Sequence, residues 1–148
     1  GGTTGEAASL NVAERKQLLA AWIKAARPHG VSVISQVGGA PLPDVIELAK
    51  FSEEVAADAM MTLPELYYKP RNVEQLVTYL QTVSSAAPAL PLVYYHFPMM
   101  SGVDLNMQDF FATAKDRIPN FMGMKADLNV AVQVADQLAP DQRVFIAN

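Results

Sequence analysis

The chain has 148 residues, is 51% hydrophobic and carries a formal net charge of −4 at pH 7, which fits one folded domain with a buried core and excludes an intrinsically disordered chain. Its charges are dispersed and no apolar stretch approaches the roughly 20 residues of a membrane helix, which argues against a nucleic-acid or membrane partner. It contains no Cys, which excludes disulfides, thiolate metal ligands and a Cys nucleophile and favours a reducing, cytoplasmic location.

From residue 12 onward, segments with helical spacing alternate with short apolar runs. Val73, Leu76 and Leu80 are three and four residues apart, a spacing that places them on one face of a helix and that a strand does not produce. Asn11 and Glu14 have the spacing of a capping box at the start of the first such segment. The expected helices, in chain order, are 12–26, 45–55, 73–83, 107–114 and 128–138.

The apolar runs between these helices are bounded by Pro or Gly and are too short to be helices themselves. Runs of this kind are typical of parallel strands buried on both faces, and strict alternation with helices indicates βα units with right-handed crossovers. The sequence therefore predicts a single α/β domain, and periodicity alone leaves a TIM barrel and an open doubly wound sheet equally open. The expected strands are 31–37, 59–61, 92–97, 121–124 and 144–147.

A glycine-rich turn, Gly2-Thr3-Thr4-Gly5-Glu6, precedes the first helix. Its backbone N–H groups and the hydroxyls of Thr3 and Thr4 suit a small anion such as a carboxylate. The alternative is an ordinary turn in which the Thr side chains cap backbone groups. The turn lacks the Gly-Lys-Ser/Thr of a phosphate-binding P-loop.

Lys125 ends the apolar run that begins at Phe121. Strand alternation predicts that Phe121, Gly123 and Lys125 share one face, with Met122 and Met124 on the other, and that Gly123 leaves space beside the lysine. A dry barrel interior would favour the neutral, nucleophilic amine that imine formation requires. The alternative is a surface lysine at the end of a strand.

Tyr95 is expected on the same face of its strand as Val93, so its hydroxyl is placed to project toward Lys125. A buried phenol beside an imine can relay protons between substrate groups. Tyrosines on strands are also ordinary core residues, so Tyr94 and Tyr95 are a weak signal by themselves.

The two histidines, His29 and His96, lack neighbouring Cys or clustered carboxylates, so no metal site is expected. The methionine pairs Met60-Met61 and Met99-Met100 are expected to form core or pocket wall, because Met fills irregular apolar space.

Taken in order, three motifs resemble the superfamily of N-acetylneuraminate lyase and dihydrodipicolinate synthase, whose members are (β/α)8 TIM barrels. The motifs are the Gly2–Glu6 turn, Tyr94-Tyr95-His96-Phe97-Pro98 and Gly123-Met124-Lys125. The resemblance covers essentially the entire chain. It implies a partial barrel of about five βα units, running from the end of barrel strand 2 to strand 7, with residues 1–148 as one aldolase domain that lacks the barrel's first and last elements.

The same resemblance implies roles for individual residues. Lys125 forms a Schiff base with the substrate's keto carbon, Tyr95 relays protons, and Thr3 and Thr4 hold the carboxylate of the pyruvate moiety. It further implies a small-molecule substrate, no cofactor, no metal, and a homotetramer when the protein is full length.

The form Tyr-Tyr-His-x-Pro resembles the animal-type N-acetylneuraminate lyases, whereas dihydrodipicolinate synthases carry an Arg after the glycine that Gly102 matches. The expected reaction is therefore cleavage of N-acetylneuraminate to N-acetylmannosamine and pyruvate. Two alternatives remain open: another pyruvate-dependent aldolase or synthase, and an inactive homologue that binds keto acids or sialic acid.

Two positions depart from the lyase pattern. Asp127 stands where the lyases commonly have a Ser or Thr that touches substrate, and its carboxylate is expected to accept a sugar hydroxyl. The segment Pro64–Pro70 is one residue longer than the usual motif, which leaves open whether Tyr67 or Tyr68 serves a neighbouring subunit's site.

Overall fold

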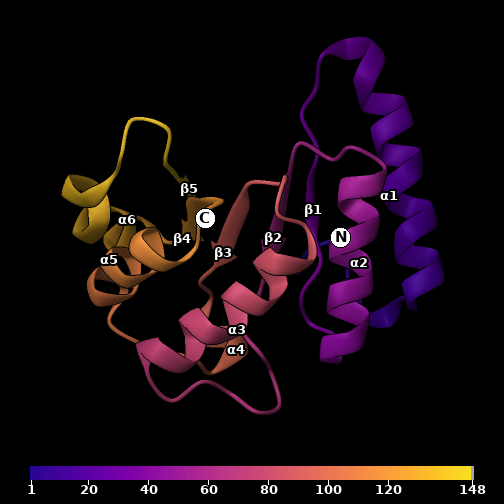
Figure 1. Ribbon diagram of the computed structural model, residues 1–148. Helices are drawn as coiled ribbons and strands as arrows, with labels where there is room; N and C mark the ends of the chain where they lie inside the picture. Colours follow the sequence, from indigo (N-terminus) through magenta and orange to yellow (C-terminus); the bar gives the residue numbers. More distant parts are fainter. Residues whose placement is uncertain (148) are drawn as a thin grey trace.

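The computed structural model describes residues 1–147, which form a parallel five-stranded sheet with the strand order β1-β2-β3-β4-β5 (Figure 1). Each strand pairs with the next in the chain, so the strand order never reverses as it does in a doubly wound sheet. Of the two folds that periodicity left open, a TIM barrel and an open doubly wound sheet, the strand order therefore supports part of a barrel. The strands are β1 (Ile34–Gln36), β2 (Ala59–Thr62), β3 (Leu92–Tyr95), β4 (Phe121–Ala126) and β5 (Arg143–Ile146).

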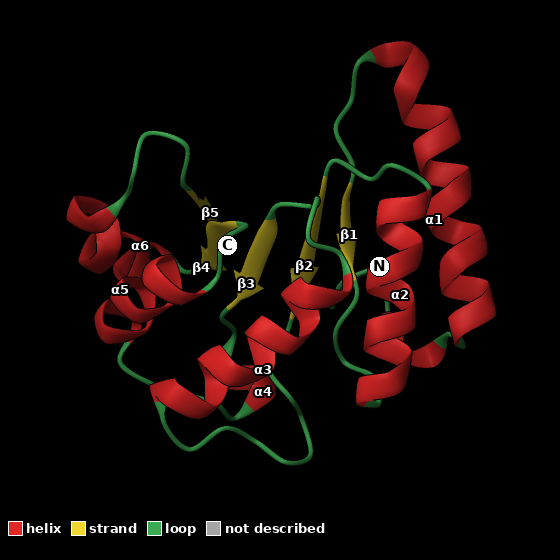
Figure 2. Ribbon diagram, in the orientation of Figure 1, coloured by secondary structure: helices red, strands yellow, loops and turns green. Residues whose placement is uncertain are grey.

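The helices follow one side of the curved row of strands, and the opposite side of the row carries no helix among the described residues (Figure 2). Short 3-10 turns at 7–9, 27–29 and 135–137 flank them. The helices are α1 (Val12–Ala26), α2 (Leu42–Glu54), α3 (Val73–Ala86), α4 (Pro98–Ser101), α5 (Met107–Arg117) and α6 (Leu128–Val134). None of the helices within residues 1–147 combines the length and apolar character needed to cross a bilayer.

Local sequence explains where several helices begin. The capping box predicted for α1 is confirmed: Asn11 Oδ1 accepts a hydrogen bond from the Glu14 N–H, and Glu14 Oε2 accepts one from the Asn11 N–H, both at 2.9 Å. α2 begins three residues earlier than expected because a proline in the first turn fits a helix start. Asn72 and Asn106 cap α3 and α5 in the same way as Asn11 caps α1.

The hydrophobic core fills the layer between the sheet and the helices. Its largest fully buried side chains include Tyr94 on β3, Phe110 and Phe111 on α5, and Met124 on β4. Met60 lies in this core, as predicted. Met100 is 67% exposed and lines a hollow together with Thr3, as a pocket wall residue. The prediction is wrong for Met99, which is 84% exposed.

The two exposed methionines lie on α4, an element that the periodicity did not reveal. It is a single turn that begins at Pro98 and ends at Ser101, and Gly102 after it has φ +67°. Proline suits the first turn and glycine the left-handed residue after the last. A segment of four residues is too short to show helical spacing, so only these two end signals were available in the sequence.

The strand β4 departs from simple alternation at its first residues. Leu92 pairs with Phe121 and Val93 pairs with Gly123, so Met122 is an extra residue in the ladder. Phe121 consequently turns toward the helices, where its ring centre lies 5.2 Å from that of Phe111. The prediction that Phe121 shares a face with Lys125 is therefore wrong, because it assumed unbroken alternation.

Gly123 is required for a different reason from the one expected. Its φ is +146°, and a Cβ at this position would lie 1.8 Å from the carbonyl oxygen of Arg143 on β5. The missing side chain thus makes room for the backbone of the neighbouring strand.

Candidate functional site

Tyr95 and Lys125 meet at the carboxyl end of the sheet because they are register partners on β3 and β4. The Lys125 Nζ lies 4.1 Å from the centre of the Tyr95 ring. The Tyr95 hydroxyl lies 3.3 Å from the hydroxyl of Thr3, which comes from the glycine-rich turn before α1. Three predicted site residues from three separate segments therefore lie together: Tyr95 contacts Lys125 through its ring and Thr3 through its hydroxyl.

The orientation of the two tyrosines on β3 resolves which one belongs to the site. Tyr95 is 4% exposed and stacks on Phe97, with ring centres 5.7 Å apart and an angle of 9° between the planes. Tyr94 points to the opposite side and packs against Phe110 in the core, with ring centres 4.9 Å apart. The predicted assignment of Tyr95 to the site side agrees with this geometry.

Lys125 is held by the strands on both sides of β4. Its backbone carbonyl accepts a hydrogen bond of 2.9 Å from the N–H of His96, and its register partner on β5 is Phe145. The side chain is half-buried, and its amine lies over the face of the Tyr95 ring. This contact with the ring is a cation–π arrangement when the amine is protonated.

The turn that carries Thr3 is closed by two backbone hydrogen bonds, from the Glu6 N–H to the Thr3 carbonyl (3.1 Å) and from the Ala7 N–H to the Gly2 carbonyl (3.3 Å). Among the described side chains, Thr3 is the one that reaches the Tyr95 hydroxyl. Thr4 lies in the same turn with an exposed side chain. The structure therefore brings Thr3, and not Thr4, into contact with the other site residues.

Asp127 lies two residues after Lys125 and caps α6. Its Oδ1 accepts a hydrogen bond of 3.1 Å from the Val130 N–H. A carboxylate at this position satisfies a free backbone donor and complements the helix dipole. Helix capping thus gives a structural reason for an Asp at this position, where the lyases commonly have Ser or Thr. The predicted contact with substrate would be a second role.

One residue of the site region was missed as a functional candidate, because His96 was considered only as a metal ligand. It is 4% exposed, and its Nδ1 has no hydrogen-bond partner within residues 1–147. Burial lowers the pKa of the imidazole, while the nearby carboxylates of Asp104 and Asp127 act in the opposite direction. The sequence signal that could have pointed to His96 was its position immediately after Tyr95.

Within residues 1–147, no group of three or more His, Asp or Glu side chains is arranged to hold a metal ion.

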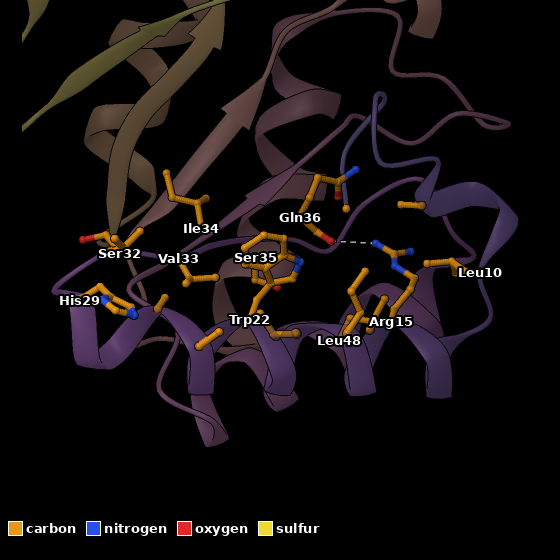
Figure 3. Close-up of a pocket in the computed structure, with 17 residues that line it drawn as sticks. Leu10, Arg15, Trp22, His29, Ser32, Val33, Ile34, Ser35, Gln36 and Leu48 are labelled. Carbon is orange, nitrogen blue, oxygen red and sulfur yellow. Dashed lines mark hydrogen bonds between the residues drawn. The ribbon is translucent and has the colours of Figure 1, made fainter.

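A separate hollow of about 540 Å³ lies between α1 and β1 (Figure 3). Apolar side chains such as Trp22 and Leu48 line it, and Arg15 stands at one end. The Arg15 guanidinium donates to the backbone carbonyls of Gln36 (2.8 Å) and Gly38 (3.1 Å). This hollow lies beside β1 at the edge of the sheet, on its helix side, and none of the predicted site residues lines it.

Comparison with known proteins places this geometry in a family. Residues 1–146 match the dihydrodipicolinate synthetase family. The chain belongs to this family. It is 41% identical over 130 residues to N-acetylneuraminate lyase B of Xenopus laevis, covering 87% of this chain and 49% of that protein. It is 36% identical over 148 residues to N-acetylneuraminate lyase of Homo sapiens, covering 98% of this chain and 46% of that protein.

A solved structure gives the same relationship in three dimensions. The N-acetylneuraminate lyase (sialic acid aldolase) of Aliivibrio salmonicida is 34% identical and superposes with a TM-score of 0.89, over 97% of this chain and 48% of that one. The predicted fold, part of a (β/α)8 TIM barrel, is therefore confirmed. The chain spans about half the length of the relatives it matches.

Proposed function

We propose that the protein to which this chain belongs is a Schiff-base aldolase that cleaves N-acetylneuraminate to N-acetylmannosamine and pyruvate. The observation that carries the proposal is the contact of the Lys125 amine with Tyr95, whose hydroxyl in turn contacts Thr3. The relatives named N-acetylneuraminate lyase supply the substrate class.

The proposed chemistry balances with these residues alone. The Lys125 amine attacks the C2 ketone of the open-chain substrate, and loss of water gives a protonated imine. The Tyr95 phenol donates the proton that the departing water needs and becomes a phenolate. The phenolate then accepts the proton of the C4 hydroxyl by way of the substrate carboxylate, which Thr3 and Thr4 hold, and the electrons of the C3–C4 bond move into the imine. N-acetylmannosamine leaves, and Tyr95 donates its proton to C3 of the enamine. Water then hydrolyses the protonated imine, which releases pyruvate and the free Lys125 amine and returns a proton to Tyr95. Asp127 is proposed to accept a hydroxyl of the sugar.

We propose further that the whole protein is a cytoplasmic homotetramer that needs neither cofactor nor metal. Tyr67 and Tyr68 support the assembly, because they are 83% and 82% exposed and form an edge-to-face pair 5.0 Å apart on the loop after β2. Large exposed aromatic side chains side by side are typical of interface surfaces. One of the two is proposed to serve a neighbouring subunit's site.

The decisive experiment is borohydride reduction of the native protein in the presence of pyruvate, followed by peptide mapping. The adduct is expected on Lys125 and is expected to be lost, together with cleavage, in Lys125→Ala. Lys115→Ala on α5 is the matched control and should keep both, because Lys115 is exposed and its amine donates to the Gln137 carbonyl, away from Tyr95 and Thr3. Label on Lys69 or Lys115 would overturn the assignment of the amine.

Tyr95→Phe separates binding from chemistry in the same assay. It should keep the pyruvate adduct while slowing cleavage by about 10²-fold or more, the usual scale for loss of a positioned acid–base group. Identifying the aldehyde released with pyruvate distinguishes this reaction from that of another pyruvate-dependent aldolase. A native protein that binds sialic acid but gives no adduct would instead be an inactive homologue.

A further inference from the structure

The side chain of Gln36, at the carboxyl end of β1, is a buried amide that the proposed chemistry does not use. It is 8% exposed, and its Oε1 has no hydrogen-bond partner within residues 1–147. Ser35, the residue before it, points to the helix layer, where its hydroxyl accepts a hydrogen bond of 2.7 Å from the hydroxyl of Ser52 on α2. Because successive side chains of a strand alternate, Gln36 points to the side of the sheet that carries Tyr95 and Lys125.

Gln36 lines a hollow of about 220 Å³ next to the proposed site. The glycine-rich turn forms one wall of this hollow through Thr3, and Met100 and Ser101 of α4 form another. Glu6 also lines the hollow, but its side chain is exposed, so its charge stays hydrated. A water molecule takes up about 30 Å³ of liquid volume, so the hollow has room for a three-carbon acid such as pyruvate.

The backbone that carries Gln36 is fixed from both sides of the strand end. The Arg15 guanidinium on α1 donates to the carbonyls of Gln36 (2.8 Å) and Gly38 (3.1 Å), and the Gln36 side chain points away from Arg15 (Figure 3). A Cβ at Gly38 would lie 2.5 Å from the hydroxyl oxygen of Thr62 on β2, so β1 and β2 approach closely there. The amide therefore extends toward the hollow from a rigid support.

An amide at this position opposes stability rather than adding to it. Burial of an amide costs free energy unless its oxygen and N–H groups find partners, and an apolar side chain of the same shape would avoid that cost. A ligand in the hollow therefore explains Gln36 better than packing does. Because Oε1 is enclosed by protein, the N–H donors of Nε2 are the groups that the amide can present to a ligand.

We propose that the Gln36 amide donates a hydrogen bond to the carboxylate of the keto acid, which makes Gln36 a further substrate-positioning residue beside Thr3. That this carboxylate belongs to the pyruvate moiety rests on the proposed function, whereas the binding of a three-carbon carboxylate beside Gln36 does not. An amide N–H and a threonine hydroxyl are both donors, and an ionised carboxylate only accepts. Two donors from two separate segments fix the orientation of the acid, and with it the position of the keto carbon relative to Lys125.

Binding of (S)-lactate tests the contact without the proposed chemistry, because lactate has a carboxylate but no ketone and cannot form an imine. Isothermal titration calorimetry should show that the native protein binds lactate. Gln36→Met, which keeps the length of the side chain without its N–H groups, should weaken binding by about 10-fold or more, and Gln36→Glu should weaken it further by charge repulsion. Gln17→Met and Gln17→Glu, at an exposed position of α1, are the matched controls and should keep the wild-type affinity. No lactate binding by the wild type, or unchanged affinity in Gln36→Met, would overturn the proposal.

Thermal denaturation of the same variants separates this role from a structural one. Gln36→Met should unfold at or above the wild-type midpoint, because it removes a buried oxygen that has no partner within residues 1–147. A lower midpoint would show that the amide is paired within the fold and would overturn the proposal.

Borohydride reduction with pyruvate then distinguishes the inference from the proposed function. Gln36→Met should raise the pyruvate concentration that gives half-maximal adduct by the factor measured for lactate, and should leave the adduct at saturation unchanged. A different factor would overturn the assignment of the carboxylate to the keto acid. A wild type that binds lactate through Gln36 but forms no adduct would refute the proposed function and leave the carboxylate site in place.

Discussion

Individual residues at this site are constrained by backbone register as much as by side-chain chemistry. Tyr95 and Lys125 face each other because residues at the same level of two parallel strands point to the same side of the sheet. At Gly123, two residues before the lysine, a Cβ would meet the carbonyl oxygen of Arg143 on β5. The lysine's placement therefore depends on a glycine that takes no part in the proposed chemistry.

Substitution of Gly123 tests this dependence. Gly123→Ala should lower the free energy of unfolding by more than about 3 kcal/mol, because the new Cβ meets the Arg143 carbonyl oxygen and the positive φ disfavours any side chain. Gly30→Ala is the matched control: it also has a positive φ, of +64°, but nothing lies within 4 Å, and it should cost about 1–2 kcal/mol. Urea denaturation of the native protein measures both. Equal losses in the two variants would show that β5 can move away.

The pH dependence of stability should carry the signature of His96. Burial lowers the pKa of this imidazole in the folded protein, so the unfolded chain, whose imidazole titrates near 6.5, binds the proton more readily. The resulting contribution to stability is complete above about pH 6.5 and is lost as the pH falls through the lower folded-state pKa. Denaturation at about pH 7.5 and about pH 5 should therefore show a smaller difference for His96→Asn than for the wild type. An identical difference would mean that His96 is solvated.

Much of the site could be predicted from the sequence because its residues stand at the ends of strands. Alternation placed Tyr95 and Lys125 correctly, since a period of two holds over the last residues of β3 and β4. It failed at Phe121, because an extra residue in a ladder leaves no mark in the pattern of apolar residues. His96 was missed because the lack of a partner for a buried nitrogen is visible only in three dimensions.

At the scale of elements, the ends of helices position the segments that surround the lysine. Asn106 Oδ1 accepts from the N–H groups of Gln108 and Asp109 at the start of α5, and Asp127 does the same for Val130 at the start of α6. Both helices follow strands of the site, so a frayed first turn would loosen the loops beside it. The ends of the helices were predictable within a few residues, because capping and proline signals are local.

Asp127 allows the capping role and the predicted substrate contact to be separated. Asp127→Ala should cost about 1 kcal/mol of stability, whereas Asp127→Ser, which can still cap the helix, should cost little. If Asp127 also accepts a sugar hydroxyl, Asp127→Ala should raise KM for N-acetylneuraminate. Asp127→Ser, which introduces the residue type common in the lyases at this position, should raise it less. Thermal denaturation and steady-state kinetics of the native protein measure the two effects. Unchanged KM in both variants would leave Asp127 as a helix cap only.

At the scale of the whole molecule, the described sheet has two outer strands with one neighbour each. β1 pairs only with β2, and β5 pairs only with β4 within residues 1–147. Phe145 and Ile146 on β5 are 37% and 53% exposed, and Trp22 on α1 is 59% exposed. Outer strands with exposed apolar side chains are templates for pairing with other chains.

The 148-residue chain expressed by itself is therefore expected to be marginally stable or to self-associate. Size-exclusion chromatography should show species larger than a monomer, and thermal denaturation should lack a single cooperative transition. Ile146→Lys, on the outer strand, should increase the soluble monomer fraction, because a charge on an edge strand opposes pairing. A wild-type monomer that melts cooperatively would contradict this expectation.

The extra residue Met122 divides β4 into two halves of opposite phase. Counted back from Lys125, odd-numbered positions face the proposed site, yet Phe121, also odd-numbered, lies among the core aromatics. In a regular strand of the same residues, Phe121 and Lys125 would share a face, because they are four residues apart. With Phe121 anchored in the core, the amine would then turn toward the helix layer. An ammonium there would lose its hydration without gaining a partner. The side to which the amine of Lys125 points thus depends on an irregularity of the backbone rather than on a side chain, and comparison of sequences by residue type alone would not register it.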